Sequence, residues 1–332
     1  MLQRADASSK RLTVGPRVTA GRLVRSVLAA AVLAYSPGCT SMPAVPDAER
    51  ASLRYFGYAL VDCGFDDPLD ADRSTGYVSE VAPFTNIAQL CVFDPAENIQ
   101  GRLALMSQHR IRALLSVQAI FFVGTPDSAQ GGRTKFTLHP QYRARWEAFV
   151  RNNHLLQQNS AIAAFYIADE PVWNGIAYAD LKAAADIVDA SFPGIPSAII
   201  EAHASLADFQ VPPSVDWIGF DHYAIPRPAE DPGFRRELAL LKSKRSHPSQ
   251  RIVLVMDAQW LPFYGEAGYP ESHMATVARS YHDMARADPE VIGIIGYLWP
   301  GGLDHPQQKG VRNLPQSVIA EHRRIGTSIT GK

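Results

Sequence analysis

Short apolar runs alternate along the chain with longer polar or amphipathic stretches. Eight such runs cover residues 54–63, 86–93, 111–122, 161–168, 196–202, 215–223, 251–257 and 291–299. Between them, the spacing of apolar residues predicts helices over 95–109, 139–158, 176–191, 232–246 and 270–287. Runs that are apolar throughout are typical of strands covered on both faces, and strands that alternate with helices pair in parallel. Eight such strands in roughly 250 residues predict a (β/α)8 TIM barrel as a single domain.

The alternative architecture with the same alternation is an open, doubly wound sheet. Such a sheet usually carries a glycine-rich first turn that binds a nucleotide. The segment after the first run, GFDDPLDAD, contains no G-x-G-x-x-G, and no G-x-x-x-x-G-K-[ST] occurs in the chain. The barrel is therefore the favoured fold, and we expect no cofactor.

The N-terminal segment differs in composition from the rest of the chain. Up to Ala44 it has one acid, Asp6, against six basic residues, and the apolar run VLAAAVLAY ends at Tyr35. A basic region, a short apolar core and small residues before a cleavage point form a secretory signal that is too short to span a bilayer. Gly38-Cys39 resembles the end of a bacterial lipoprotein signal, in which Cys39 would be lipidated. The alternative is a plain signal peptide cut nearby.

This interpretation divides the chain into a signal peptide over 1–38, a linker over 39–52 and a barrel domain over 53–328. It predicts an exported protein, either a cell-envelope lipoprotein of the periplasm or outer membrane or a secreted protein, with membrane contact only through a lipid anchor. Cys63 and Cys91 would then meet an oxidising compartment and could form a disulfide. Because the sequence does not show their geometry, two buried free thiols are the favoured expectation.

The overall composition narrows the class of partner. The chain of 332 residues is 46% hydrophobic and has a formal net charge of −1. This leaves ample apolar material for a core. A near-neutral balance without a long basic run argues against nucleic acid as a partner. We expect a monomer.

In a parallel barrel, functional side chains lie at the carboxyl ends of the strands. Polar residues end seven of the eight runs: Asp62, Asp94, Gln118, Asp169 with Glu170, Glu201 with His203, Asp221 with His222 and Tyr223, and Asp257 with Gln259. Three of the five tryptophans, Trp173, Trp260 and Trp299, fall at the same rim. Carboxylates move protons and bind hydroxyls, and aromatic faces stack on the C–H faces of sugar rings. The set predicts a carbohydrate-binding cleft; the alternative is that the acids cap helices and the tryptophans close the barrel.

These strand ends resemble those of the clan A glycoside hydrolases, barrels of the cellulase and β-galactosidase type. Those enzymes carry Asn-Glu-Pro at the end of strand 4, with the Glu as acid/base, and this chain has Asp169-Glu170-Pro171 there. They often have a Tyr after strand 6 and a Trp ending strand 8, matched by Tyr223 and Trp299. The resemblance covers residues 54–300 through motifs of two or three residues. It implies a single catalytic domain that hydrolyses a poly- or oligosaccharide, with Glu170 as general acid/base.

Two positions depart from the pattern of that family. Asp169 replaces the Asn that holds the sugar 2-hydroxyl, and its charge would raise the pKa of Glu170, which suits a general acid. Strand 7 ends in Asp257 rather than in the nucleophilic Glu. Asp257 is the expected second catalytic carboxylate, with Glu201 and Asp221 as alternatives. Inverting enzymes hold their carboxyl groups farther apart than retaining ones, so the shorter Asp favours inversion.

The remaining rim residues are assigned to substrate binding. They are Asp62, Asp169, Trp173, Glu201, Asp221, His222, Tyr223, Trp260 and Trp299. A catalytic metal is not expected, because the chain has no H-E-x-x-H and no second tight His pair, and no G-x-S-x-G supports a serine hydrolase. The competing function is a surface lipoprotein that binds glycan without cleaving it, since the missing strand 7 Glu is what a degenerate hydrolase would show.

Overall fold

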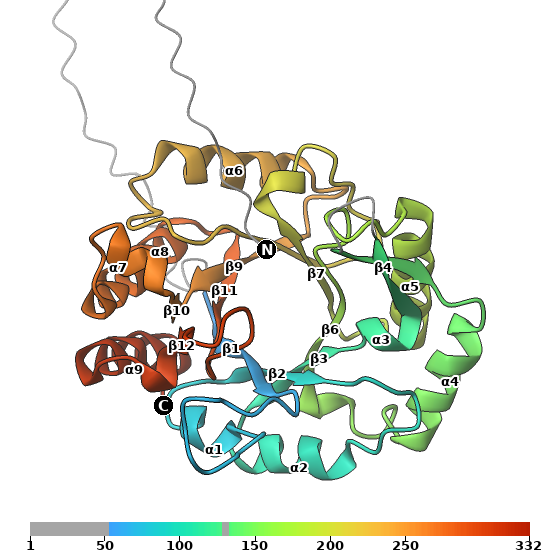
Figure 1. The fold of residues 1–332 in the computed structure, drawn as a ribbon. Helices are drawn as coiled ribbons and strands as arrows, with labels where there is room; N and C mark the ends of the chain where they lie inside the picture. Colours follow the sequence, from blue (N-terminus) through green and yellow to red (C-terminus); the bar gives the residue numbers. More distant parts are fainter. Residues whose placement is uncertain (1–52, 128–132) are drawn as a thin grey trace, which may run out of the picture. The chain divides into compact units, whose positions relative to one another are not determined.

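The computed structural model describes residues 53–127 and 133–332, which form a closed barrel of parallel strands (Figure 1). The strands are β1 (Tyr55–Asp62), β2 (Ile87–Cys91), β3 (Arg112–Ser116), β6 (Ile162–Asp169), β7 (Ser197–Ala202), β8 (Trp217–Asp221), β9 (Arg251–Asp257) and β11 (Val291–Tyr297). Each pairs with the next one around the ring, and β11 closes the ring on β1. The predicted (β/α)8 fold is confirmed, and every apolar run contributes one barrel strand.

Helices surround the barrel (Figure 1). The longer ones are α2 (Gln100–Gln108), α4 (Tyr142–Asn152), α5 (Tyr178–Ser191), α6 (Pro232–Ser243), α8 (Met274–Ala287) and α9 (Gln316–Thr330). The first five fall within the predicted helical segments, whereas α9 follows the last strand, in a region where no helix is predicted from the sequence. The shorter elements are α1 (Val78–Val81), α3 (Gln118–Phe121), α7 (Pro262–Glu266), the 3-10 turns Asn159–Ala161, His203–Ser205, Glu271–His273 and Val311–Asn313, and the strand pairs β4 (Phe122–Asp127) with β5 (Arg133–Leu138) and β10 (Gln259–Trp260) with β12 (Lys309–Gly310).

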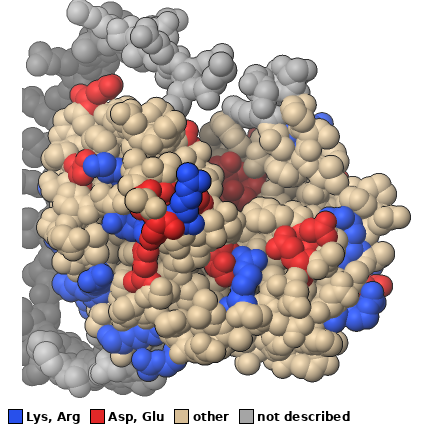
Figure 2. Space-filling view, turned by 60° about the horizontal axis from the view of Figure 1, so that its bottom comes forward, with Lys and Arg blue, Asp and Glu red and all other residues tan. Residues whose placement is uncertain are grey.

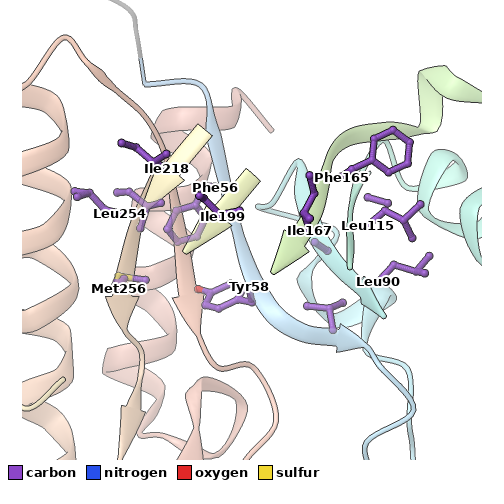
Figure 3. Packing of buried hydrophobic residues seen from close by; sticks show 14 of the residues in the cluster. Phe56, Tyr58, Leu90, Leu115, Phe165, Ile167, Ile199, Ile218, Leu254 and Met256 are labelled. Atoms are coloured by element: carbon purple, nitrogen blue, oxygen red, sulfur yellow. The ribbon is translucent and has the colours of Figure 1, made fainter. Parts of the chain in front are cut away.

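Both faces of the barrel sheet are buried. Successive side chains of a strand face opposite sides, so in β9 Val253 and Val255 belong to the interior cluster, while Leu254 and Met256 belong to the outer cluster. Figure 3 shows part of the outer cluster, including Phe56, Tyr58, Leu90, Leu115, Phe165, Ile167, Ile199 and Ile218. Burial on both faces explains why the strands are apolar throughout in the sequence.

The third apolar run is divided in the structure. β3 ends at Ser116, and the chain then turns into α3, whose Ile120 and Phe121 are fully buried. The hairpin of β4 and β5 follows. The prediction of one strand over 111–122 is therefore wrong beyond Ser116, because a short buried helix and a buried strand have the same unbroken apolar sequence.

Cys63 and Cys91 form a disulfide beside the carboxyl ends of β1 and β2. These two strands pair directly, and the cysteine Cα atoms lie 4.6 Å apart. The expectation of two free thiols is wrong, because the strand pairing brings the two residues within the reach of a disulfide. On the same side, Arg102 of α2 donates hydrogen bonds of 3.1 Å to both carboxylate oxygens of Asp62 and to the carbonyl of Cys91.

Replacing both cysteines with serine is expected to lower the free energy of unfolding by roughly 3 kcal/mol, because the bond closes a loop in the unfolded chain. The two residues are 28 positions apart. Guanidinium unfolding of the double variant and of the wild type measures the difference. Wild type treated with reductant serves as the control and should match the double variant. Equal stability of all three samples would contradict the prediction.

The predicted signal peptide, the linker and the lipidation site Cys39 lie outside the described residues. Within residues 53–127 and 133–332, no helix is long and apolar enough to cross a membrane. Export and lipidation therefore stay predictions from the sequence.

Candidate active site

The carboxyl ends of the strands surround a cavity of about 360 Å³, called the mouth below. Its lining includes the carboxyl groups of Asp169, Glu170, Asp221 and Asp304 and the rings of Tyr166, Tyr223 and Tyr297. Apart from Gln89, the other lining residues are apolar, and none is Lys or Arg. In Figure 2 one group of acidic side chains lies deep in a hollow, while charged side chains of both signs are spread over the surrounding surface. A cavity lined in this way favours neutral or cationic ligands over anions.

Two consecutive acids line the mouth because the chain turns sharply at Glu170. Neighbouring residues of a regular strand point to opposite faces, so Asp169 and the next residue could not both face one cavity. Glu170 has a φ of +46°, a left-handed conformation that is costly for a residue with a Cβ atom. The turn is held by hydrogen bonds of 2.7 Å from the Glu170 N–H to the Ile200 carbonyl and from the Asp169 N–H to Gln118 Oε1. Backbone strain of this kind is typical of functional sites.

Glu201 lies behind this turn and is absent from the lining of the mouth. Its buried carboxyl group accepts hydrogen bonds from the backbone N–H groups of Val172 (2.8 Å), Trp173 (3.2 Å) and Ala202 (3.0 Å). Burial raises the pKa of Glu201 to about 7, and the three hydrogen bonds oppose that rise. The residue expected from the sequence to bind substrate instead fixes the segment that follows Glu170, which makes it a positioning residue.

The carboxyl groups of Glu170 and Asp221 line the same cavity. Two buried carboxylates in one site repel each other, so protonation of one of them is favoured. Burial and the charges of Asp169 and Glu201 raise the pKa of Glu170 to about 7. Burial and the charge of Glu170 raise the pKa of Asp221 well above its usual value. Both shifts favour the protonated form near neutral pH.

Tyrosines connect the carboxyl groups of the mouth. The Tyr166 hydroxyl donates to Asp169, and the Tyr223 hydroxyl donates to Asp221 over 3.4 Å. The Tyr223 ring stacks on Tyr297 with centroids 5.2 Å apart. The Tyr297 hydroxyl in turn donates to Asp304 over 2.8 Å.

Four of the polar lining residues were not among the residues expected from the sequence to bind substrate. Tyr166 and Tyr297 lie within apolar runs, Gln89 lies within β2, and Asp304 follows β11 at a distance of several residues. Strand periodicity could have predicted that Tyr297 faces the barrel interior. It lies two residues after Ile295, which belongs to the interior cluster, and alternate residues of a strand face the same side. No sequence signal marks Asp304, since its place depends on the course of a loop.

Asp257 does not line the mouth. Its Oδ2 atom accepts hydrogen bonds of 2.8 Å from the backbone N–H of Ala224 and from the Tyr264 hydroxyl, and the side chain is 2% exposed. It lines a separate cavity beside α7. Burial raises the pKa of Asp257 to about 6. This placement differs from the expectation of a second catalytic carboxylate at the end of β9, and it removes the basis for favouring inversion.

The three rim tryptophans also lie outside the lining of the mouth. Trp299 is buried in the outer core against Tyr58, and its indole N–H donates to Glu80 over 2.7 Å. The Trp260 indole N–H donates to the carbonyl of Tyr269 over 3.0 Å. Trp173 is half-buried, and its backbone N–H is bonded to Glu201. The aromatic rings that line the mouth therefore belong to tyrosines rather than to tryptophans.

Two further predicted binding residues make contacts with neighbouring elements. Asp62 is paired with Arg102 of α2. His222 Nδ1 lies 2.7 Å from Glu237 Oε2, and its ring stacks on His203 with centroids 3.6 Å apart and an interplanar angle of 4°. Neither Asp62 nor His222 lines the mouth.

His203, His222 and Glu237 bring together three side chains of the kinds that bind metal ions. Each residue offers one ligand atom, and these atoms lie within 4.8 Å of one another. A metal ion lies close to the plane of an imidazole that binds it, and two parallel rings stacked at 3.6 Å cannot both meet this condition. As placed, the three side chains form a stacked and hydrogen-bonded group beside Asp221 that does not fit a metal ion.

The barrel is similar to solved glycosidase structures. It aligns with native xylanase 10B from Thermotoga maritima at 13% identity and a TM-score of 0.53, over 86% of this chain and 99% of that one. An α-amylase from Geobacillus thermoleovorans complexed with acarbose aligns at 11% identity and a TM-score of 0.53, over 85% of this chain and 79% of that one. A GH2 β-galacturonidase from Eisenbergiella tayi bound to galacturonate aligns at 12% identity and a TM-score of 0.57, over 83% of this chain and 51% of that one. At these identities the similarity establishes the fold alone. No protein-family model and no curated protein sequence matches the chain.

Proposed function

We propose that the protein is a glycoside hydrolase that cleaves a neutral poly- or oligosaccharide in the mouth, with Glu170 as the proton donor. The observation that carries the proposal is the Glu170 carboxyl group, placed by a strained turn in a cavity lined with other carboxyl groups and tyrosines. A general acid must hold its proton near neutral pH, and the raised pKa of Glu170 meets that need. The glycosidase barrels to which the fold is similar add support at the level of architecture.

In the proposed reaction, Glu170 donates its proton to the glycosidic oxygen as the bond from that oxygen to the sugar breaks, and a water molecule adds to the anomeric carbon. Asp221, which lines the mouth together with Glu170, takes the role of second carboxylate in place of Asp257 and accepts the proton that this water gives up. Asp169 and Asp304 line the same cavity, and their negative charge would stabilise positive charge that develops on the sugar ring. Tyr223 and Tyr297 offer stacked aromatic rings beside the carboxyl pair. We further propose that the protein is exported, as its N-terminal sequence predicts.

The test is hydrolysis of a panel of glycans by the full chain. Xylan, β-glucan and starch oligosaccharides represent neutral substrates, and oligogalacturonides represent anionic ones. Release of new reducing ends from a neutral glycan, with none from oligogalacturonides, is the expected result, because the mouth has four carboxyl groups and no cation. Cleavage of oligogalacturonides alone would contradict the proposed substrate class.

One observation favours a second candidate, a glycan-binding protein without catalysis. β9 brings no carboxylate to the mouth, since its terminal Asp257 lines a different cavity. A pure binder would show no release of reducing ends, and Tyr297→Ala would weaken glycan binding more than Glu170→Gln. A hydrolase would show turnover that depends on Glu170.

The pH dependence of kcat/KM should report the raised pKa of Glu170. The acid must be protonated to act, so activity is expected to fall as the pH rises through about 7. Asp169→Asn removes the neighbouring charge, lowers the pKa of Glu170, and should move this fall to lower pH. Asn at 169 can still accept the Tyr166 hydrogen bond. Glu147→Gln, an exposed change on α4, is the control. A profile of Asp169→Asn that coincides with the wild type would contradict the role of Asp169.

A further inference from the structure

The peptide that joins Asp169 to Glu170 has both of its polar groups hydrogen-bonded. Its N–H donates to the Ile200 carbonyl over 2.7 Å, and its C=O accepts a hydrogen bond of 3.1 Å from Nδ2 of Asn174. Because a peptide is a rigid plane, these two bonds fix the direction of the whole unit. That direction sets the φ of Glu170, which is +46°. The two bonds therefore determine where the Glu170 side chain leaves the backbone.

A second arrangement of this peptide is available to the chain. Rotation of the plane about its two Cα atoms would bring the φ of Glu170 to a negative value, which a residue with a Cβ atom prefers. The rotation would turn the C=O away from Asn174 and the N–H away from Ile200, so both hydrogen bonds would be lost. A left-handed residue costs about as much free energy as one hydrogen bond contributes. The Ile200 bond alone would leave the two arrangements close in free energy, and the bond from Asn174 favours the left-handed one.

Asn174 is itself fixed on both sides of its Cα atom. Its N–H donates to the Glu170 carbonyl over 2.8 Å, and its carbonyl accepts a hydrogen bond of 2.9 Å from the N–H of Phe136 on β5. The β4–β5 hairpin packs closely against this segment, since a Cβ atom added at Gly175 would lie 3.1 Å from Cγ of Lys135. The hairpin thus supports the backbone that presents the Asn174 amide to Asp169.

We propose that Asn174, supported by the β4–β5 hairpin, is a positioning residue that holds the carboxyl group of Glu170 in the orientation needed for proton donation. The inference rests on the proposed function, in which Glu170 is the proton donor. Glu201 bonds the residues that follow Glu170, and Gln118 bonds the N–H of Asp169, so neither fixes the 169–170 peptide itself. Proton transfer requires the donor within hydrogen-bond reach of the substrate, so a small displacement slows the reaction while the cavity can still bind substrate.

The kinetic test compares Asn174→Ala with the wild type on a natural glycan that the wild type cleaves. We expect kcat to fall by about tenfold to a hundredfold and KM to change by less than about threefold. Asn152→Ala, which changes an exposed asparagine at the end of α4, is the matched control and should leave both constants unchanged. In a Glu170→Gln background, Asn174→Ala should cause little further loss of kcat, because no proton donor is left to position. An equal loss in both backgrounds would indicate a general structural effect and would overturn the proposal.

Crystal structures of the wild type and of Asn174→Ala give a readout that does not depend on turnover. The variant should show the 169–170 peptide rotated and a negative φ at Glu170, whereas the wild type should keep the left-handed turn. If Asn174→Ala fails to fold, as judged by circular dichroism, Asn174→Asp takes its place, because it keeps the shape of the side chain and has no N–H donor.

Failure of this inference can be distinguished from failure of the proposed function. A wild type that cleaves no glycan would contradict the proposed function and, with it, the catalytic role of Asn174. A wild type that cleaves glycan, together with a folded variant of unchanged kcat and unchanged turn, would overturn this inference alone.

Discussion

Glutamine in place of Glu170 is expected to lower kcat by a factor of about 10² to 10⁴, while the affinity for the same oligosaccharide stays close to that of the wild type. The amide is nearly the same size as the carboxyl group, so the mouth should keep its shape. It cannot donate a proton to the leaving oxygen. The loss should therefore fall on turnover rather than on binding.

The measurement pairs steady-state kinetics with calorimetric binding of a neutral oligosaccharide. Aryl glycosides with strongly acidic leaving groups add a specific readout, because such groups depart without protonation. The variant should approach wild-type rates on these substrates and fail on natural ones. Glu147→Gln is the matched control. Unchanged kcat on a natural glycan, or loss of binding with unchanged kcat, would remove Glu170 from the role of proton donor.

Alanine in place of Glu201 should lower both the free energy of unfolding and kcat, although Glu201 does not line the mouth. Removing the carboxyl group leaves the N–H groups of Val172, Trp173 and Ala202 without their acceptor. Each buried donor that stays unpaired costs roughly 1–3 kcal/mol, and solvent entering the gap will pair some of them. We expect the free energy of unfolding to fall by about 3 kcal/mol. We expect kcat to fall too, because segment 171–173 fixes the turn at Glu170.

Guanidinium unfolding at several pH values tests this prediction. The folded-state pKa of Glu201, near 7, lies above its value in the unfolded chain, so the native state binds more protons between about pH 4.5 and 7. Its contribution therefore makes the wild type less stable as the pH rises through that range. The alanine variant should lose this part of the pH dependence. The control is Glu147→Ala on the exposed face of α4, which should change stability by less than about 0.5 kcal/mol. Equal stability of the two variants would contradict the positioning role of Glu201.

The barrel could be predicted from the sequence because burial on both faces leaves each strand as an unbroken apolar run. The same property hides the boundary between a strand and a short buried helix, so the strand predicted over 111–122 includes α3. No helix is predicted from the sequence after the last strand, although α9 buries Val318, Ile319 and Ile325 there. The disulfide depended on the direct pairing of β1 and β2, which apolar runs alone do not specify.

Strand ends predicted part of the site. Asp169, Glu170, Asp221 and Tyr223 line the mouth, as expected for residues at the carboxyl ends of β6 and β8. Asp257 ends its strand in the same way but points elsewhere, because Ala224 and Tyr264 supply hydrogen bonds on the other side. The direction of a terminal side chain depends on loops that lie far away in the sequence.

The direction of the tryptophan side chains also could not be predicted from the sequence. An indole at a strand end can face a cavity or the core, and its direction depends on which hydrogen-bond acceptor its N–H reaches. The Trp299 indole N–H donates a hydrogen bond to Glu80 on α1, far away in the sequence, and this bond holds the ring in the outer core. Asp304 is the converse case, since a loop residue without any strand signal reaches the mouth and binds Tyr297.

Within the closed ring, the pairing of β1 with β2 is irregular. The register passes from Tyr58 opposite Ala88 to Asp62 opposite Leu90, and between these pairs the Leu60 N–H bonds the side chain of Gln89 instead of a backbone carbonyl. The Cys63–Cys91 bond links the two strands just past this register shift. Reduction should therefore loosen the pairing of β1 with β2 first, and proteolysis of the reduced protein is expected to begin near residues 58–62.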